Sequence, residues 1–87
     1  MTTIHLEELG EVAHDLVITL MKYDAPLLKN LYHYVPKVTG NKWPPSTIRM
    51  ALQRHCHTSN WYQGKFDLFE HLDNGCWRLR PGIKIQS

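Results

Sequence analysis

Residues 44–80 read PPSTIRMALQRHCHTSNWYQGKFDLFEHLDNGCWRLR, and this stretch decides the fold. Its two prolines, followed by a serine and a threonine, are typical of a helix start. Apolar residues then recur at three- and four-residue spacing. We therefore expect a helix over residues 46–57, with Ser46 or a neighbour as its cap, and a polar loop over 58–64.

The second half of this stretch predicts a β-hairpin. Asn74-Gly75 is the pair most favoured in a tight turn between two strands. Apolar and aromatic residues flank this pair on both sides. We expect a hairpin over about 65–80, followed by an irregular tail over 81–87.

Two further helices are expected earlier in the chain. Residues 5–22 carry an apolar stripe with helical spacing. A second helix over 26–35 would have Asp24 as its cap, Pro26 in its first turn, and Pro36 ending or bending it. Three helices followed by a two-stranded hairpin is the order of a winged helix-turn-helix, an α+β fold whose third helix enters the DNA major groove. The alternatives are a three-helix bundle with an added hairpin, or a small α+β interaction module.

Charge is distributed unevenly along the chain. The 87 residues suffice for one domain, with a net charge of +2. Residues 1–24 contain five acids and one base, whereas residues 25–87 contain nine bases and three acids. No acid occurs from Ala25 to Phe66. We expect one strongly basic face, which would attract polyanions such as nucleic acid. The alternative is that the asymmetry reflects helix packing or a protein partner.

The segment from His55 to Phe69, HCHTSNWYQGKFDLF, resembles a pattern of winged-helix domains attached to prokaryotic HNH-type restriction endonucleases. Those domains read H-S-S-D-S-x-x-Y-x-G-x-x-D-L-F, preceded by S-x-I/V-R-x-x-L-Q and followed by G-x-W-x-L-R. The matching positions are Ser46, Ile48, Arg49, Leu52, Gln53, His55, Ser59, Tyr62, Gly64, Asp67, Leu68, Phe69, Gly75, Trp77, Leu79 and Arg80. The chain departs from the pattern at Cys56, His57 and Thr58.

This resemblance implies a domain that reads duplex DNA, and some domains of this type resemble the reader domain of a methyl-directed restriction enzyme that senses N6-methyladenine. The chain shows no His-Asn-His nuclease layout and no paired nuclease carboxylates, so we expect no nuclease within it. A nuclease domain would instead be a partner of the reader.

The expected third helix offers side chains that suit DNA. Arg pairs with guanine and Gln with adenine, so Arg49, Gln53 and Arg54 are candidates for reading bases. The same helical face carries Thr47, Met50 and His57. Phosphate contacts are expected from Lys37, Lys42, Ser46, Thr47 and Lys65. The alternative is a solvated surface, with Arg49 bonded to the hairpin or to Asp67.

Aromatic residues follow this helix. A methyl group on adenine is a small apolar projection in the major groove, which Trp61 or Met50 could contact, with a gain of about 1 kcal/mol. Tyr62 is a further candidate contact, although it and Trp43 could equally complete the core.

Metal binding and catalysis find little support in the sequence. The His55-Cys56-His57 run has poor ligand spacing, because adjacent helical residues point about 100° apart. His55 fits a packing role better. Cys56, His55 and Asp67 could be drawn as a catalytic set, but no oxyanion-type glycine loop accompanies them. We expect no metal, no cofactor and no enzyme.

The sequence therefore predicts a cytoplasmic protein that binds duplex DNA, with no membrane segment and no secretory leader. Its role would be the targeting module of a restriction system, or that of a free-standing small protein of prokaryotic or phage origin, and its specificity would favour adenine-methylated sites. One alternative is a small protein-interaction module, such as an anti-restriction or anti-CRISPR inhibitor, whose basic face occupies an acidic surface or whose acidic helix 5–22 mimics DNA. Another is a transcriptional regulator of the same fold that dimerises on a palindromic site.

Overall fold

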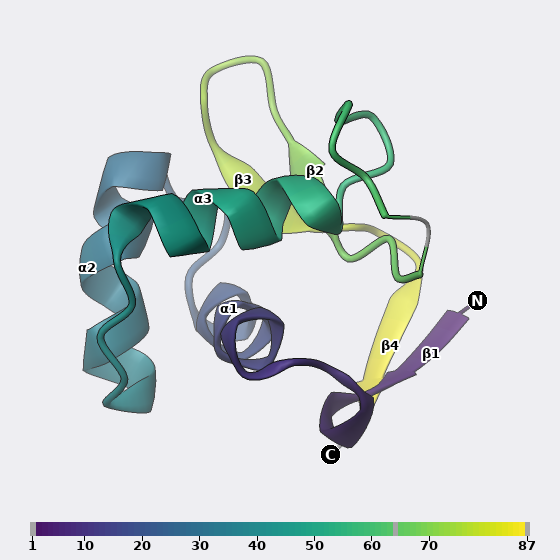
Figure 1. Ribbon diagram of the computed structural model, residues 1–87, viewed down its shortest axis with the longest axis horizontal. Helices are drawn as coiled ribbons and strands as arrows, with labels where there is room; N and C mark the ends of the chain where they lie inside the picture. Colours follow the sequence, from purple (N-terminus) through teal and green to yellow (C-terminus); the bar gives the residue numbers. More distant parts are fainter. Residues whose placement is uncertain (1, 64, 87) are drawn as a thin grey trace.

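The computed structural model describes residues 2–63 and 65–86. In this part of the chain, three α-helices and a two-stranded antiparallel sheet form a small α+β domain (Figure 1). The elements in order are β1 Thr2–His5, the 3₁₀ turn η1 Leu6–Glu8, α1 Glu11–Lys22, α2 Leu28–Thr39, α3 Pro45–Arg54, β2 Phe69–His71, β3 Trp77–Leu79 and β4 Ile83–Gln86.

The first helix is shorter than the sequence predicts. α1 begins at Glu11 with Gly10 as its N-cap, so the expected start at residue 5 is wrong. His5 is instead the last residue of β1, and η1 lies between β1 and α1. Because glycine is a poor helix former, a helix start after Gly10 is favoured locally. The apolar stripe itself is confirmed: its buried members are Ala13, Leu16, Val17 and Leu20.

The second helix lies two to four residues later than expected. Its N-cap is Leu27, so the predicted cap at Asp24 and the predicted place of Pro26 in the first turn are both wrong. The Pro26 carbonyl instead accepts the backbone N–H of Trp77 at 3.0 Å. Pro36 does not end the helix, which continues to Thr39. Gly40 caps its C-terminal end in the left-handed conformation, with φ 78°.

The third helix begins one residue earlier and ends three residues earlier than predicted. Pro44 is its N-cap, so Ser46 is not the cap. The helix ends at Arg54 because the His55 carbonyl turns to accept the backbone N–H groups of Leu68 and Phe69, at 2.8 and 3.1 Å. These two bonds tie the end of α3 to the start of the hairpin.

The hairpin is confirmed, with a narrower paired region than 65–80. β2 and β3 pair antiparallel, with Phe69 opposite Leu79 and His71 opposite Trp77. Gly75 lies in the connecting turn at φ 81°, a conformation that favours glycine. A bridge between Leu27 and Cys76 joins the hairpin to the start of α2.

Residues 83–86 of the expected irregular tail form a strand. β4 pairs in parallel with β1, from Thr2 opposite Ile83 to His5 opposite Gln86 (Figure 1). Ile4 is buried, and Ile83 and Ile85 pack against the core beside it. The alternation of apolar and polar residues over 83–86 suits a strand with one covered face.

One acid lies among the apolar residues of the core. Asp15 on α1 is buried, and its Oδ2 accepts hydrogen bonds from Asn41 Nδ2 at 2.9 Å and Trp43 Nε1 at 2.8 Å. Burial raises the pKa of Asp15, but hydrogen bonds from Trp43, Asn41 and His14 outweigh burial and hold that pKa below its usual value. The carboxylate therefore fixes the α2–α3 connection, residues 40–44, to α1.

We predict that Asp15→Asn lowers the free energy of unfolding by about 2–3 kcal/mol at pH 7, because hydrogen bonds to a charged acceptor are lost inside the core. Because the pKa of Asp15 is lower in the folded than in the unfolded chain, the unfolded chain binds a proton at Asp15 more tightly. The stabilisation by the carboxylate is therefore fully present above the pKa of the unfolded state and is lost as pH falls through the pKa of the folded state. The stability gap between wild type and variant should therefore shrink below about pH 4.

Urea unfolding at several pH values checks this prediction. Asp24→Asn is the matched control, since it removes the same charge from an exposed position and should change stability by less than about 0.5 kcal/mol. A variant at Asp15 as stable as wild type at pH 7 would show that the carboxylate does not hold the connection.

Candidate nucleic-acid interface

The outer face of α3 is set by the residues that the helix buries. Ile48 and Leu52 have no exposed surface and belong to the core shared with α1 and α2. With about 100° between successive residues, the opposite side of the helix is centred near Met50. Six predicted DNA contacts lie on or beside this outer face: Ser46, Arg49 and Arg54 exposed, and Thr47, Met50 and Gln53 partly exposed.

Arg49 and Arg54 are the positive charges on this face of α3. Both side chains are exposed, and in the described part of the chain neither forms an ion pair. Asp67, the alternative partner of Arg49, contacts Arg80 instead, with 2.7 Å between Arg80 Nε and Asp67 Oδ2. Both guanidinium groups therefore face solvent, where they can meet an external anion.

Two hollows flank this face. The hairpin cleft, about 340 Å³, lies between α3, the loop after α3 and the hairpin, and its lining includes Gln53, Thr58, Asn60, Trp61, His71 and Trp77. The α1 groove, about 550 Å³, lies between α1 and α3, and its lining includes Glu11, Val12, Thr47, Met50, Arg54 and Gln63. The α1 groove therefore contains an acid as well as a base.

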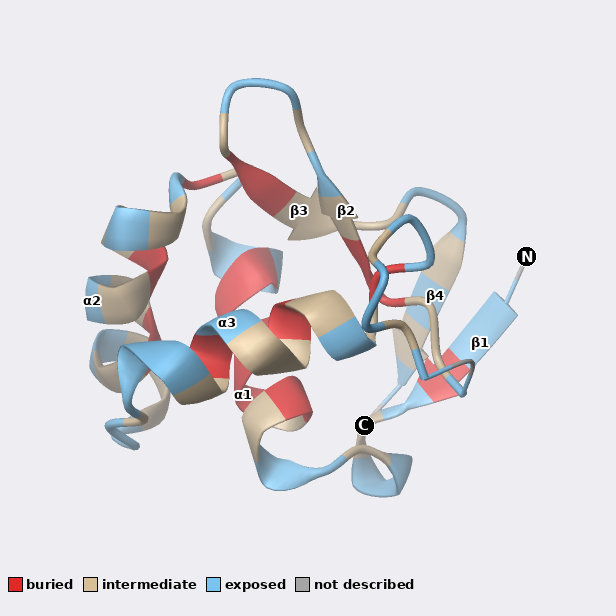
Figure 2. Cartoon of the chain, turned by 45° about the horizontal axis from the view of Figure 1, so that its top comes forward, coloured by how far each residue is buried: buried red, intermediate tan, exposed pale blue. Residues whose placement is uncertain are grey.

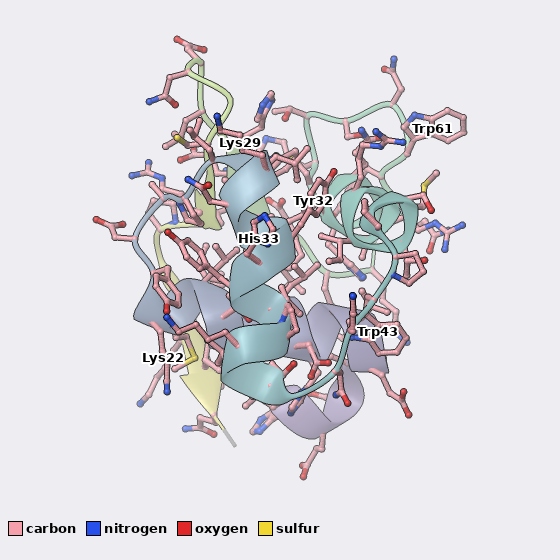
Figure 3. The ribbon with its side chains drawn as sticks, turned by 90° about the vertical axis from the view of Figure 1, so that its left-hand side faces the viewer. Lys22, Lys29, Tyr32, His33, Trp43 and Trp61 are labelled. Atoms are coloured by element: carbon pink, nitrogen blue, oxygen red, sulfur yellow. The ribbon has the colours of Figure 1, made fainter. Side chains whose placement is uncertain are left out.

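The two proposed methyl contacts do not share a hollow. Trp61 lines the hairpin cleft together with Gln53, whereas Met50 lines the α1 groove together with Arg54. Trp61 is 61% exposed and Trp77 only 6%. Figure 3 shows Trp61 beyond the outer side of α3, with Trp43 beside the segment that leads into the helix.

The loop after α3 holds two further predicted contacts. His57 lies outside the helix, and its Nδ1 is 3.0 Å from Asp67 Oδ2. Its backbone N–H also donates to Asp67 Oδ1 at 3.1 Å. Tyr62 is partly buried, so only part of its side chain is available for a contact with DNA. Figure 2 shows most of this loop and the hairpin tip as exposed.

The expected phosphate contacts divide into two groups. Lys42 is exposed in the α2–α3 connection, and Ser46 and Thr47 lie in the first turn of α3. Lys65 is elsewhere: it lines a third hollow beside β1 and β4, and its Nζ lies 5.5 Å from the Phe66 ring centroid. Lys42 therefore lies just before the start of α3, whereas Lys65 lies away from the outer face of α3.

His55 has the packing role that the sequence predicts. Its Nδ1 lies 3.3 Å from the Phe66 carbonyl, and its ring meets Phe69 edge-on. Burial lowers the pKa of His55, the hydrogen bond to Phe66 raises it, and the charge of Arg54 lowers it, for a net decrease. The imidazole is therefore neutral at pH 7, and the positive charge near the end of α3 comes from arginine.

Sequence reasoning missed two sets of residues that shape this surface. Asp15 and Asn41 hold the connection before α3, and the only local signal was an acid inside an apolar stripe. His71 and Trp77 line the hairpin cleft from the other side, with ring centroids 4.6 Å apart. No local pattern could place them there, because the cleft exists only once the hairpin docks beside α3.

In the described part of the chain, no group of three or more His, Cys, Asp or Glu side chains is arranged to hold a metal ion. The helices of that part are too short or too polar to cross a bilayer.

Comparison of the sequence with protein families and curated proteins, and of the fold with solved structures, finds no match in any of the three.

We predict that Trp61 accounts for most of the tryptophan emission that acrylamide can quench. It is far more exposed than Trp77, and the indole N–H of Trp43 is bonded to Asp15. Trp61→Phe should lower the Stern–Volmer constant by more than half, whereas Trp77→Phe should leave it equal or higher. Equal quenching of wild type and Trp61→Phe would mean that the indole is covered.

Proposed function

We propose that this chain is a winged helix-turn-helix domain that binds duplex DNA through the outer face of α3 and the hairpin beside it. The observation that carries the proposal is the pair of exposed guanidinium groups of Arg49 and Arg54, free of ion pairs within the described residues, on a helix whose opposite face is the core. Gln53 between them adds a side chain suited to a base edge.

The arrangement of the elements supports the winged-helix assignment. α3 lies across the domain with its outer face free, and the hairpin stands next to it (Figure 1). The hairpin is tied to the α1–α2 connection by the Leu27–Cys76 bridge and by the bond from the Trp77 backbone N–H to the Pro26 carbonyl. It is tied to the end of α3 by the bonds from the backbone N–H groups of Leu68 and Phe69 to the His55 carbonyl. A helix and a hairpin held side by side can meet one stretch of DNA together.

The charge pattern supports DNA over an acidic protein partner only in combination with the fold. The acid-free run from Ala25 to Phe66 contains α2, the α2–α3 connection and α3. Lysines on these elements would neutralise phosphates and position the domain, whereas Arg49, Gln53 and Arg54 would read bases. The domain would then serve as the reader of a restriction system.

The adenine-methyl preference is a proposal that now rests on Trp61. A methylated adenine needs an apolar surface for its methyl group and a hydrogen-bonding partner for its edge. Trp61 and Gln53 line the same cleft, whereas Met50 faces the other hollow. We therefore assign the methyl contact to Trp61.

The inhibitor alternative, in which an acidic helix over 5–22 mimics DNA, is less well supported, because the exposed acids are divided between η1 and α1. Glu7 and Glu8 lie in η1, outside α1, and Asp15 is buried and bonded to Trp43 and Asn41. Of the expected acids, only Glu11 is exposed on the helix itself.

We predict that Arg54→Glu weakens binding to a short duplex by at least tenfold at 50 mM salt, measured by fluorescence anisotropy. The slope of log affinity against log salt should also decrease in magnitude by about 1, because one phosphate or base contact is lost and a repulsive charge is added. Lys84→Glu is the matched control: it makes the same change of charge at an exposed position on β4 and should alter affinity by less than twofold.

Two comparisons make this experiment decisive. Adenine-methylated duplex should bind wild type more tightly than unmodified or cytosine-methylated duplex, and Trp61→Ala should remove the difference. Absence of binding at low salt would overturn the DNA proposal and direct the search to an acidic protein partner. Equal loss with Arg54→Glu and Lys84→Glu would show that net charge, and not the face of α3, controls binding.

A further inference from the structure

The hairpin cleft is large enough to hold a small ligand. It opens between the last turn of α3, the loop over residues 56–61 and the hairpin, and its volume is about 340 Å³. This volume is within the range of small-molecule sites in proteins, about 300–1,000 Å³. Segments that are distant in sequence converge here, because α3 and the hairpin are docked side by side (Figure 1).

Trp61 leaves a large apolar ring in solvent at the edge of this cleft. Its side chain is the most exposed large hydrophobic group in the described part of the chain, at 61%. The local backbone is held in place by two hydrogen bonds. The backbone N–H of Trp61 donates to Ser59 Oγ at 3.1 Å, and the backbone N–H of Ser59 donates to the Cys56 carbonyl at 3.0 Å. An exposed aromatic ring on an ordered turn offers a flat surface for stacking.

Two amide side chains beside Trp61 have unused hydrogen-bonding capacity. Gln53 and Asn60 both line the cleft, and within the described residues no hydrogen bond is made by either side-chain amide. An amide carries both a donor and an acceptor, the combination that recognises the edge of a nucleobase.

The rest of the lining favours a neutral, planar ligand over a phosphate. No Lys, Arg, Asp or Glu side chain lines the cleft among the residues that the structure describes. His71 is exposed and stacks on Trp77 with centroids 4.6 Å apart, and Cys56 and Trp77 are buried, so one wall of the cleft is aromatic. A phosphate would need cations or several free backbone N–H groups, whereas a base needs an aromatic face and a few polar atoms.

We propose that the hairpin cleft receives a single nucleobase displaced from the DNA stack, with its face against Trp61 and its edge bonded to Gln53 and Asn60. This inference rests on the proposed DNA binding, and it places the base that Trp61 and Gln53 contact outside the stack, while Arg49 and Arg54 contact the stacked duplex. The energy needed to displace a base is lowest where the base is already mispaired. The domain should therefore bind more tightly to a duplex that contains a mismatch.

The experiment compares two duplexes that differ only in one central base pair, matched in one and mismatched in the other, by anisotropy at one salt concentration. Wild type should bind the mismatched duplex on the order of tenfold more tightly. Trp61→Ala and Gln53→Ala should each reduce this ratio toward one, chiefly by weakening the mismatched complex. Thermal melting monitored by circular dichroism establishes that both variants are folded.

Arg54→Glu separates this inference from the proposed function. It should weaken binding to both duplexes by a similar factor and leave their ratio unchanged, because Arg54 lines the α1 groove and not the cleft. Equal affinity of wild type for the two duplexes would overturn the base site while DNA binding still holds. A preference that persists in Trp61→Ala would also overturn it, because mismatched DNA is then selected by its flexibility alone. Binding to neither duplex would overturn the proposed function itself.

Discussion

The structure depends on one buried carboxylate. Asp15 lies among the apolar residues of α1 and accepts hydrogen bonds from Asn41 and Trp43 in the connection before α3. A buried charge is costly unless donors surround it, so this connection is held where Asn41 and Trp43 reach the carboxylate. Because α3 begins directly after Trp43, that placement also sets where α3 crosses α1, and therefore which of its residues face solvent.

The hairpin is positioned by ties of a different kind. Backbone bonds join it to the end of α3 through the His55 carbonyl, and to the α1–α2 connection through Pro26 and Leu27. These bonds do not depend on side-chain identity, so the distance between α3 and the hairpin is a property of the fold. The side chains that fill the resulting cleft, Trp61 above all, are then free to serve recognition.

Local patterns predicted most of this architecture. The stripe around Leu16 located the body of α1, and the Asn74-Gly75 pair located the hairpin turn. The same local reasoning failed wherever a distant segment decides the conformation. β4 is a strand only because β1, at the other end of the chain, pairs with it. The helical period predicted that Arg49, Gln53 and Arg54 lie on the side of α3 away from the core, but it could not show that His71 lines the same cleft as Gln53, or that Lys65 lies beside β1 and β4.

The parallel pairing of β1 and β4 has a mechanical consequence. Thr2 lies beside Ile83, and Gln86 lies beside His5, so the chain leaves the pair at opposite ends of the two strands. A force that pulls the two ends of the domain apart would slide the strands along each other and load all their hydrogen bonds at once. Strands joined in this geometry resist in shear, whereas a hairpin pulled from its open end separates one bond at a time. Tension transmitted through flanking chain would therefore meet this pair first, before it reached α3.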